Sequence, residues 1–145
     1  MIEKMKALLK TKDVCVMATV IGDVPHCSLM SYATDDEGRE VYMVTGRETK
    51  KYRNLLHNPA VSLLIDTRED DRGDRRARAQ ALTVNGRAET VREVEKRADI
   101  RRRLLARHPH LQTLLDNPEA ELIAVHIGSF QLLEGIAAAS YISIE

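Results

Sequence analysis

Residues 26–59 read HCSLMSYATDDEGREVYMVTGRETKKYRNLLHNP, and this stretch decides the fold. It predicts a strand over about residues 25–32, followed by the acidic turn DDEG at 35–38, whose Asp and Gly residues favour chain reversal. A second strand is predicted over 40–45, where Val, Tyr, Met, Val and Thr follow one another. The stretch therefore begins as a strand, a turn and a strand.

A short basic helix is predicted after this strand, from about residue 48 to His57, with Asn58 and Pro59 ending it. Thr49, Lys50 and Lys51 fall in its first turn. A helix start carries free N–H groups and a partial positive charge, and lysines there add both donors and charge. The pattern predicts a seat for a phosphate group. His57 is interpreted as a histidine at the helix C-terminus rather than a ligand.

The segment before this stretch predicts a helix and a strand. Apolar residues at helical spacing among lysines predict an amphipathic helix over 2–11. The run VCVMATVI at 14–21 predicts a strand buried on both sides, and the following Gly22 turns the chain into the next strand. Cys15 and Cys27 are interpreted as small buried hydrophobic residues rather than a redox pair or metal ligands.

After the basic helix, a strand is predicted over 60–66 and a solvated loop over 66–78, where acids and arginines are mixed. A long strand is predicted over 79–91. Asn85-Gly86 within it indicates either a hairpin turn or a bulge.

The remaining chain predicts helices over 93–107 and 111–115, a main strand over 121–134 and a short terminal strand over 141–144. Six or so strands joined mostly by tight turns favour antiparallel pairing. The prediction is a mainly β fold, a small β-barrel with flanking helices, formed by one domain over residues 1–145.

Composition excludes several classes of function. The formal net charge is +0 and Trp is absent, so neither a charge-driven grip on nucleic acid nor a base-stacking platform is expected. No apolar run is long enough to cross a bilayer, and the charged start MIEKMKALLK does not read as a signal peptide. We expect a cytoplasmic protein without nucleic-acid or membrane partners. No metal site is predicted, because the spacing of His108 and His110 offers no further close ligands.

The order of these elements resembles the FMN-binding split barrel of the pyridoxamine 5′-phosphate oxidase-like flavoproteins. The resemblance is carried by VPHCSLMSYATDDEGREVYMVTGRETKKYRNLLHNPAVSLLI and the later ALTVNGRAETV. It spans roughly residues 13–91, with the final main strand placed as in the family. It implies a homodimer that holds FMN in a groove between the two subunits.

The resemblance also implies the cofactor-binding residues. Thr49, Lys50 and Lys51 match the segment that holds the FMN phosphate. Met43 and Val44 match positions that touch the flavin largely through main chain, and Thr45 follows them. The strand beside the flavin ring and ribityl chain is matched by His26, Cys27, Ser28, Leu29, Met30 and Ser31.

Two of these matches depart from the family pattern. His26 and Ser31 stand where the oxidase has Arg and Lys. Gln80 is the candidate for a glutamine contact from the partner chain, although counting back from Gly86 places Ala81 at that position. A shift of one residue moves a side chain to the other face of a strand.

The C-terminal substrate segment of the oxidase, which contains Arg and Trp, has no counterpart in GIAAASYISIE. Oxidation of pyridoxamine phosphate is therefore not predicted. Three functions stay open: an FMN-dependent oxidoreductase acting on an unknown small molecule, a non-catalytic FMN binder or electron carrier, and a haem-binding relative in which His126 could be a ligand. Catalytic residues are not assigned, because the flavin itself carries the electron chemistry.

Overall fold

Strand β7 (Ala120–Glu134) is the centre of the fold in the computed structural model, which describes residues 1–145. From Ile123 to Glu134 it pairs with β6 (Gln80–Thr90). On its other side it pairs first with β4 (Glu40–Gly46) and then with β8 (Ala138–Ser143). A single strand of 15 residues thus joins three others.

The other strands extend the sheet from β6 and β4. Its order is β2-β1-β5-β6-β7-β4-β3, with β8 attached to β7, and all pairings are antiparallel. The bounds of the strands not yet given are β1 (Val14–Ile21), β2 (Val24–Ser31), β3 (Ala33–Thr34) and β5 (Ala60–Asp66). The helices are α1 (Ile2–Thr11), α2 (Lys50–His57), α3 (Val94–Arg107) and α4 (Gln112–Leu115), with short 3₁₀ helices η1 (Gly73–Arg78) and η2 (Pro109–Leu111).

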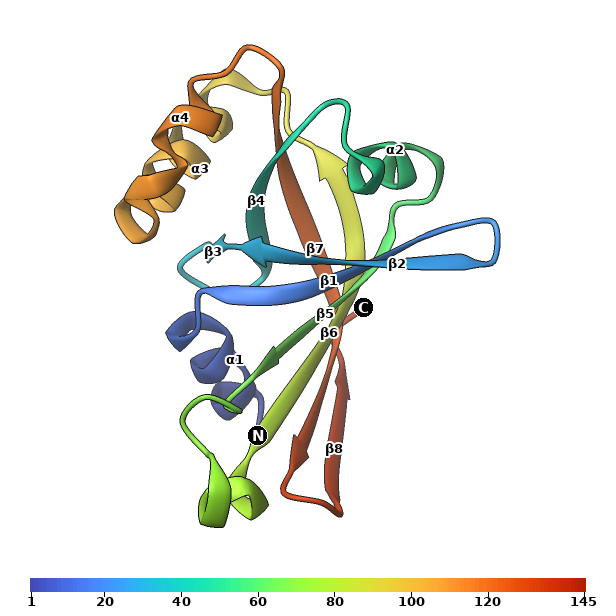
Figure 1. Ribbon diagram of the computed structural model, residues 1–145, viewed down its shortest axis with the longest axis vertical. Helices are drawn as coiled ribbons and strands as arrows, with labels where there is room; N and C mark the ends of the chain where they lie inside the picture. Colours follow the sequence, from blue (N-terminus) through green and yellow to red (C-terminus); the bar gives the residue numbers. More distant parts are fainter.

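The sheet is curled and not closed, with β2 and β3 at the ends of its order (Figure 1). This arrangement confirms the expected mainly β split barrel with flanking helices. Eight strands replace the expected six or so, because the two-residue β3 was not expected and the terminal strand is a full member of the sheet. This terminal strand, β8, spans Ala138–Ser143 rather than the expected residues 141–144. Ala138 and Ala139 join β8 through backbone pairing with the end of β7, which requires no apolar pattern.

Two apolar cores lie on opposite faces of the sheet. Met43 and Ile123, paired across β4 and β7, belong to the main core on the inner face, which α1 and α2 help to close. Their neighbours Val44 and Leu122 belong to a smaller core on the outer face, beneath α3. This separation follows from the alternation of side chains along a strand.

The outer face is covered only in part. Helix α3 packs over β4 and β7, whereas Val14 on β1 and Leu29 on β2 remain 42% and 75% exposed. The expectation that β1 is buried on both sides is therefore wrong for the single chain, in which its burial alternates. The interpretation of Cys27 as buried is also wrong, because it shares the outer face with Leu29. Cys15 is buried on the inner face, and burial raises the pKa of its thiol to about 12.

Asn85-Gly86 forms a bulge and not a hairpin turn. The pairing of β6 with β7 shifts register between these two residues, and β6 continues to Thr90. Gly86 lies so close to β7 that a Cβ atom there would be 2.4 Å from the carbonyl oxygen of His126. The absence of a side chain allows the two backbones to approach.

We expect Gly86→Ala to destabilise the protein by about 1–3 kcal/mol, since the added methyl group requires a backbone shift. Urea unfolding measures this change. Gly128→Ala is the matched control on the adjacent strand, because a Cβ there meets only the side chain of Glu145. Equal stability of the two variants would contradict the close approach at Gly86.

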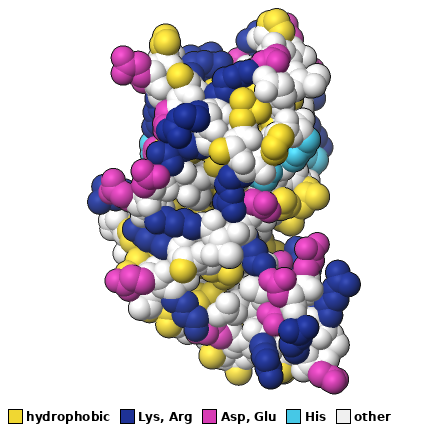
Figure 2. All heavy atoms as spheres, turned by 90° about the vertical axis from the view of Figure 1, so that its left-hand side faces the viewer, with side chains coloured by type: hydrophobic (Ala, Val, Ile, Leu, Met, Phe, Trp, Pro, Cys, Tyr) yellow, Lys and Arg dark blue, Asp and Glu magenta, His cyan; other side chains and the backbone are white.

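The charged segment over 66–78 is more ordered than the expected loop. It contains the 3₁₀ helix η1, and Thr67 donates a hydrogen bond from its hydroxyl to Asp71 at 2.6 Å. Lys12 pairs with Asp70, which anchors the segment near α1. Acidic and basic side chains are interspersed over the face shown in Figure 2. None of the helices has the length and apolar character needed to cross a membrane.

Candidate functional site

Thr49 caps the N-terminus of α2. Its hydroxyl accepts a hydrogen bond from the amide of Tyr52 at 3.3 Å and donates one to the carbonyl of Gly46 at 3.0 Å. It also lies 3.0 Å from the hydroxyl of Thr45 at the end of β4. The expected start near residue 48 is corrected by two positions, because Thr49 is the cap and Lys50 is the first helical residue.

The lysines and the arginine of this helix form no ion pairs. Lys50, Lys51 and Arg53 take part in none of the ion pairs of the protein. Lys50 is exposed and Lys51 is half-buried. The amides of Lys50 and Lys51 lie in the first turn, where N–H groups have no partner within the helix. This donor set suits a phosphate group.

We expect Thr49→Val to destabilise the protein by about 1 kcal/mol, because the helix cap is lost. Thr49→Ser keeps the hydroxyl and is the control. Urea unfolding of both variants checks this prediction, and a valine variant as stable as the serine variant would contradict the role of the cap.

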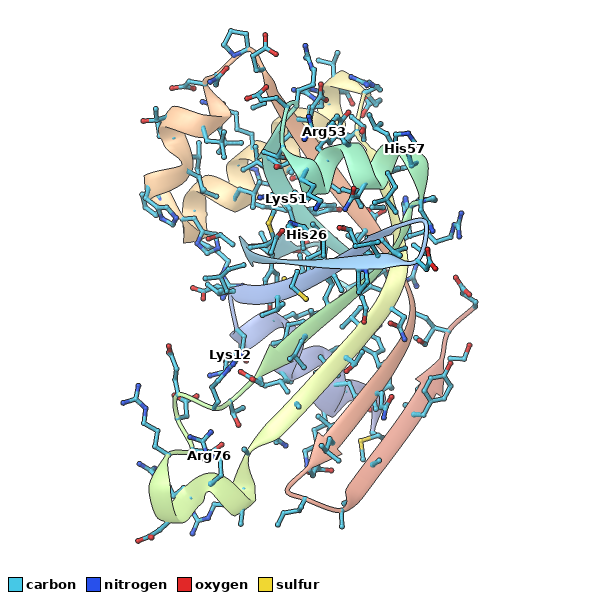
Figure 3. All side chains as sticks on the ribbon, turned by 45° about the vertical axis from the view of Figure 1, so that its right-hand side comes forward. Lys12, His26, Lys51, Arg53, His57 and Arg76 are labelled. Atoms are coloured by element: carbon cyan, nitrogen blue, oxygen red, sulfur yellow. The ribbon has the colours of Figure 1, made fainter.

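His26 lies beside the place where α2 contacts the sheet. It pairs with Thr19 across β1 and β2. The hydroxyl of Thr19 accepts a hydrogen bond from the side-chain amide of Asn54 on α2 at 3.1 Å. Figure 3 shows His26 on β2 beneath α2, in the region of Lys51. The edge strand β2 and the basic helix are thus neighbours, although they are separated in the sequence.

The six candidate residues of β2 divide between two faces. His26, Ser28 and Met30 lie on the inner face, opposite Thr19, Met17 and Cys15 of β1. The outer-face residues are Cys27, Leu29 and Ser31. A ligand on one face can contact only one of these sets through side chains.

The candidate residues of β4 offer little side-chain surface. Met43 is fully buried in the main core, and Val44 is buried in the smaller core on the other face. Thr45 is 3% exposed and directs its hydroxyl to Thr49. These side chains therefore offer a ligand little surface, and a contact with the flavin through the main chain of β4 stays a prediction.

Gln80 is not brought to the other candidates within one chain. It begins β6 at the end next to η1, where its side-chain amide donates to Glu134 at 3.4 Å. Arg76 of η1 lies near the bottom of the view in Figure 3, whereas Lys51 of α2 lies in its upper half. Gln80 could reach a ligand beside α2 only from a second copy of the chain.

A groove of about 650 Å³ opens on the outer face at one end of β1, β2 and β5. Val14, Val16, Leu29 and Leu64 form its apolar floor. Leu29 is the one predicted site residue that lines it, so this groove does not coincide with the phosphate seat. It belongs to the part of the outer face that α3 leaves uncovered.

Three of the five histidines are held by protein groups. His126 lies between Glu40 and Glu89, with its two ring nitrogens 2.7 and 2.9 Å from their carboxylate oxygens. His57 is the last residue of α2, as expected, and its Nδ1 is 2.9 Å from the carbonyl oxygen of Arg53. His108 is buried, with Nε2 2.9 Å from the carbonyl oxygen of Tyr32.

A cluster of two arginines and one glutamate near the start of α2 was not predicted from the sequence. Glu121 on β7 is 3% exposed, and its carboxylate contacts Arg47 at 3.0 Å and Arg92 at 3.4 Å. The signal in the sequence is weak, since a single acid precedes the apolar run LIAV.

The open antiparallel barrel and its basic helix define the class as a split-barrel protein with a candidate phosphate seat. The model of the family described as Pyridoxamine 5′-phosphate oxidase matches residues 1–134. The chain belongs to this family. No curated protein matches the chain.

Solved structures share the fold at low sequence identity. The structure of a haem-binding protein from Mycobacterium smegmatis has a TM-score of 0.85 and 18% identity, covering 97% of this chain and 57% of that one. HutZ, the haem storage protein from Vibrio cholerae, has a TM-score of 0.74 and 19% identity, covering 92% and 93%. A FAD-binding protein from Mesorhizobium loti has a TM-score of 0.72 and 17% identity, covering 90% and 91%.

Proposed function

We propose that this protein is a homodimeric FMN-binding flavoprotein, and that it acts as an oxidoreductase on a small molecule. The observation that carries the proposal is the N-terminus of α2, where the Thr49 cap holds unpaired Lys50 and Lys51 beside strand β2. FMN differs from riboflavin by a phosphate group, and this is the ligand group that such a seat recognises.

The chain's own residues have separate roles in this proposal. Lys50 and Lys51 bind the phosphate, while Thr49 fixes the start of the helix. His26 and Ser28 on the inner face of β2 offer polar groups to the ribityl chain or the ring edge. The bound flavin supplies the electron or hydride chemistry, so the protein's task is to orient it and control access to it.

The uncovered outer face supports the homodimer. Val14, Val16, Leu29 and Leu64 present apolar surface over neighbouring strands. Apolar surface of this kind is typical of an interface. In a symmetric dimer the same face of each copy meets its counterpart. Gln80, distant from α2 in its own chain, then becomes available to the partner's flavin.

The absorbance spectrum of the purified protein tests the cofactor, before and after incubation with FMN and removal of the excess. A retained flavin spectrum is expected. No retained flavin, together with a Soret band after haem addition, would overturn the proposal in favour of a haem-binding protein.

Steady-state assays then separate an oxidoreductase from a non-catalytic flavin carrier. Turnover of NADH or NADPH with an electron acceptor is the expected result for the FMN-loaded protein. Flavin retention without turnover across a panel of donors and acceptors would favour the carrier.

A further inference from the structure

Two hollows meet at Arg97, on the side of β7 that faces α3. The first, of about 130 Å³, has four hydrophobic residues among the six that line it. The second, of about 210 Å³, is mainly polar. Arg97 and Ala120 line both, so the two hollows adjoin and form a depression in two parts. The first is completed by Ala98, Arg101, Leu115 and Leu122, and the second by Arg47, Arg92, Pro118 and Glu121.

The arginines of the polar part are held in place. Buried Glu121 accepts from Arg47 at 3.0 Å and from Arg92 at 3.4 Å. Arg97, on α3, donates from one Nη to the carbonyl of Val91 at 3.0 Å. A guanidinium has five N–H donors, so Arg92 and Arg97 keep donors that no group of the protein uses. Arg47 is more fully engaged, because it also pairs with Glu119 at 3.5 Å.

The charges of the polar part favour a single negative charge on a ligand. Arg47 and Arg92 pair with the carboxylates of Glu119 and Glu121, and Arg97 forms no ion pair, which leaves one positive charge in excess. Glu121 would repel a dianion more strongly than a monoanion, since it lines the same hollow. A planar carboxylate matches the fork geometry of arginine.

The other part of the depression selects an apolar group. Four of its six lining residues, Ala98, Leu115, Ala120 and Leu122, are hydrophobic, and the other two are Arg97 and Arg101. We propose that this depression binds a small organic monocarboxylate, with the carboxylate at Arg92 and Arg97 and a short alkyl chain or ring against Leu115 and Leu122.

The depression adjoins the proposed flavin seat but shares none of its residues. None of Thr49, Lys50 and Lys51 lines the depression, whereas Glu121 lies directly opposite Thr45 across β4 and β7. Variants at Arg92 or Arg97 leave the lysines of α2 in place, so their effect on FMN retention can be measured separately. Figure 1 shows α3 and α4 together on the outer side of the sheet, near the start of β7.

The test is a titration of the full-length ¹⁵N-labelled protein with sodium hexanoate, followed by amide chemical shifts. We expect saturable shifts at residues of α3, α4 and the start of β7. Hexan-1-ol tests the need for the charge, and inorganic phosphate tests the need for the apolar part. Both are expected to bind at least about tenfold more weakly, because each lacks half of the recognised features.

Variants assign the binding to the arginines. Arg97→Gln and Arg92→Gln are each expected to weaken hexanoate binding by about tenfold. Arg102→Gln removes the same charge from α3 outside the depression and should bind as the unmodified protein does. Arg92 is 72% exposed, so its variant keeps the test valid if Arg97→Gln fails to fold.

Absence of shifts with hexanoate at millimolar concentration would overturn the proposal. Equal affinity for hexan-1-ol would overturn the role of the arginines, and equal affinity for phosphate would overturn the role of the apolar part. The same FMN retention in Arg92→Gln and in the unmodified protein is expected, which distinguishes this site from the flavin site.

Discussion

The Lys50→Ala, Lys51→Ala double variant is expected to bind FMN more weakly by on the order of 3–6 kcal/mol, because two charge-assisted contacts to the phosphate are lost. Riboflavin has no phosphate, so its affinity should change little. Isothermal titration of the apoprotein with each flavin measures the two effects. The double variant should fold normally, since neither lysine forms an ion pair and Thr49 still caps the helix.

Lys6→Ala, Lys10→Ala is the matched control. It also removes two positive charges that form no ion pair with a carboxylate, but from α1, away from both α2 and Gln80. The control should bind FMN as the unmodified protein does. Equal losses of affinity for FMN and riboflavin in the lysine variant would contradict the phosphate seat. An equal loss of FMN affinity in the control would show that the effect comes from the net charge alone.

Leu29→Asp is expected to dissociate the proposed homodimer. Leu29 is 75% exposed in the single chain, so the change leaves the fold intact. In a symmetric dimer the loss of apolar burial occurs in both copies and amounts to about 1.5–3 kcal/mol for each. Placing a carboxylate in an apolar interface adds a further cost. Analytical ultracentrifugation measures the shift from dimer to monomer.

Val94→Asp is the control for this change. Val94 is 79% exposed in the first turn of α3, where an acidic residue is compatible with the helix dipole. This variant should remain dimeric. Both flavins should bind poorly to Leu29→Asp if the cofactor lies between the subunits. A Leu29→Asp protein that stays dimeric would place the interface elsewhere.

Most of the fold could be predicted from local patterns. The helix over residues 50–57 and the strands on either side of it are bounded by Gly46 and by Asn58-Pro59, whose conformational preferences are strong. The sequence did not decide whether Gly86 lies in a hairpin turn or in a bulge, because this depends on how closely β7 approaches β6. That approach is a long-range feature, and a local pattern does not contain it.

The candidate site was less predictable, because side-chain direction and burial come from the whole sheet. The run 26–31 was expected as one block, whereas alternation on β2 divides it between two faces. The continuous apolar run of β1 predicted burial on both sides. In the single chain its outer face is only partly covered, so the burial along the strand alternates.

The Arg92–Arg97 depression had no signal in the sequence. Arg47, Arg92 and Glu121 lie on separate elements, and the pairing of β4 with β7 brings them together. Charged residues scattered along a chain are usually solvated, so such clusters become visible only in three dimensions.

The position of β7 in the chain has a consequence for biosynthesis. Strand β4 leaves the ribosome long before β7, yet its only other partner is the two-residue β3. Until Ala120–Glu134 has been synthesised, Val41, Tyr42, Met43 and Val44 have no sheet to join. Strands β1, β2, β5 and β6 can pair earlier, because all of them precede β7. The nascent chain therefore keeps an apolar strand without its main partner until β7 has been synthesised, and unpaired strand edges of this kind favour aggregation.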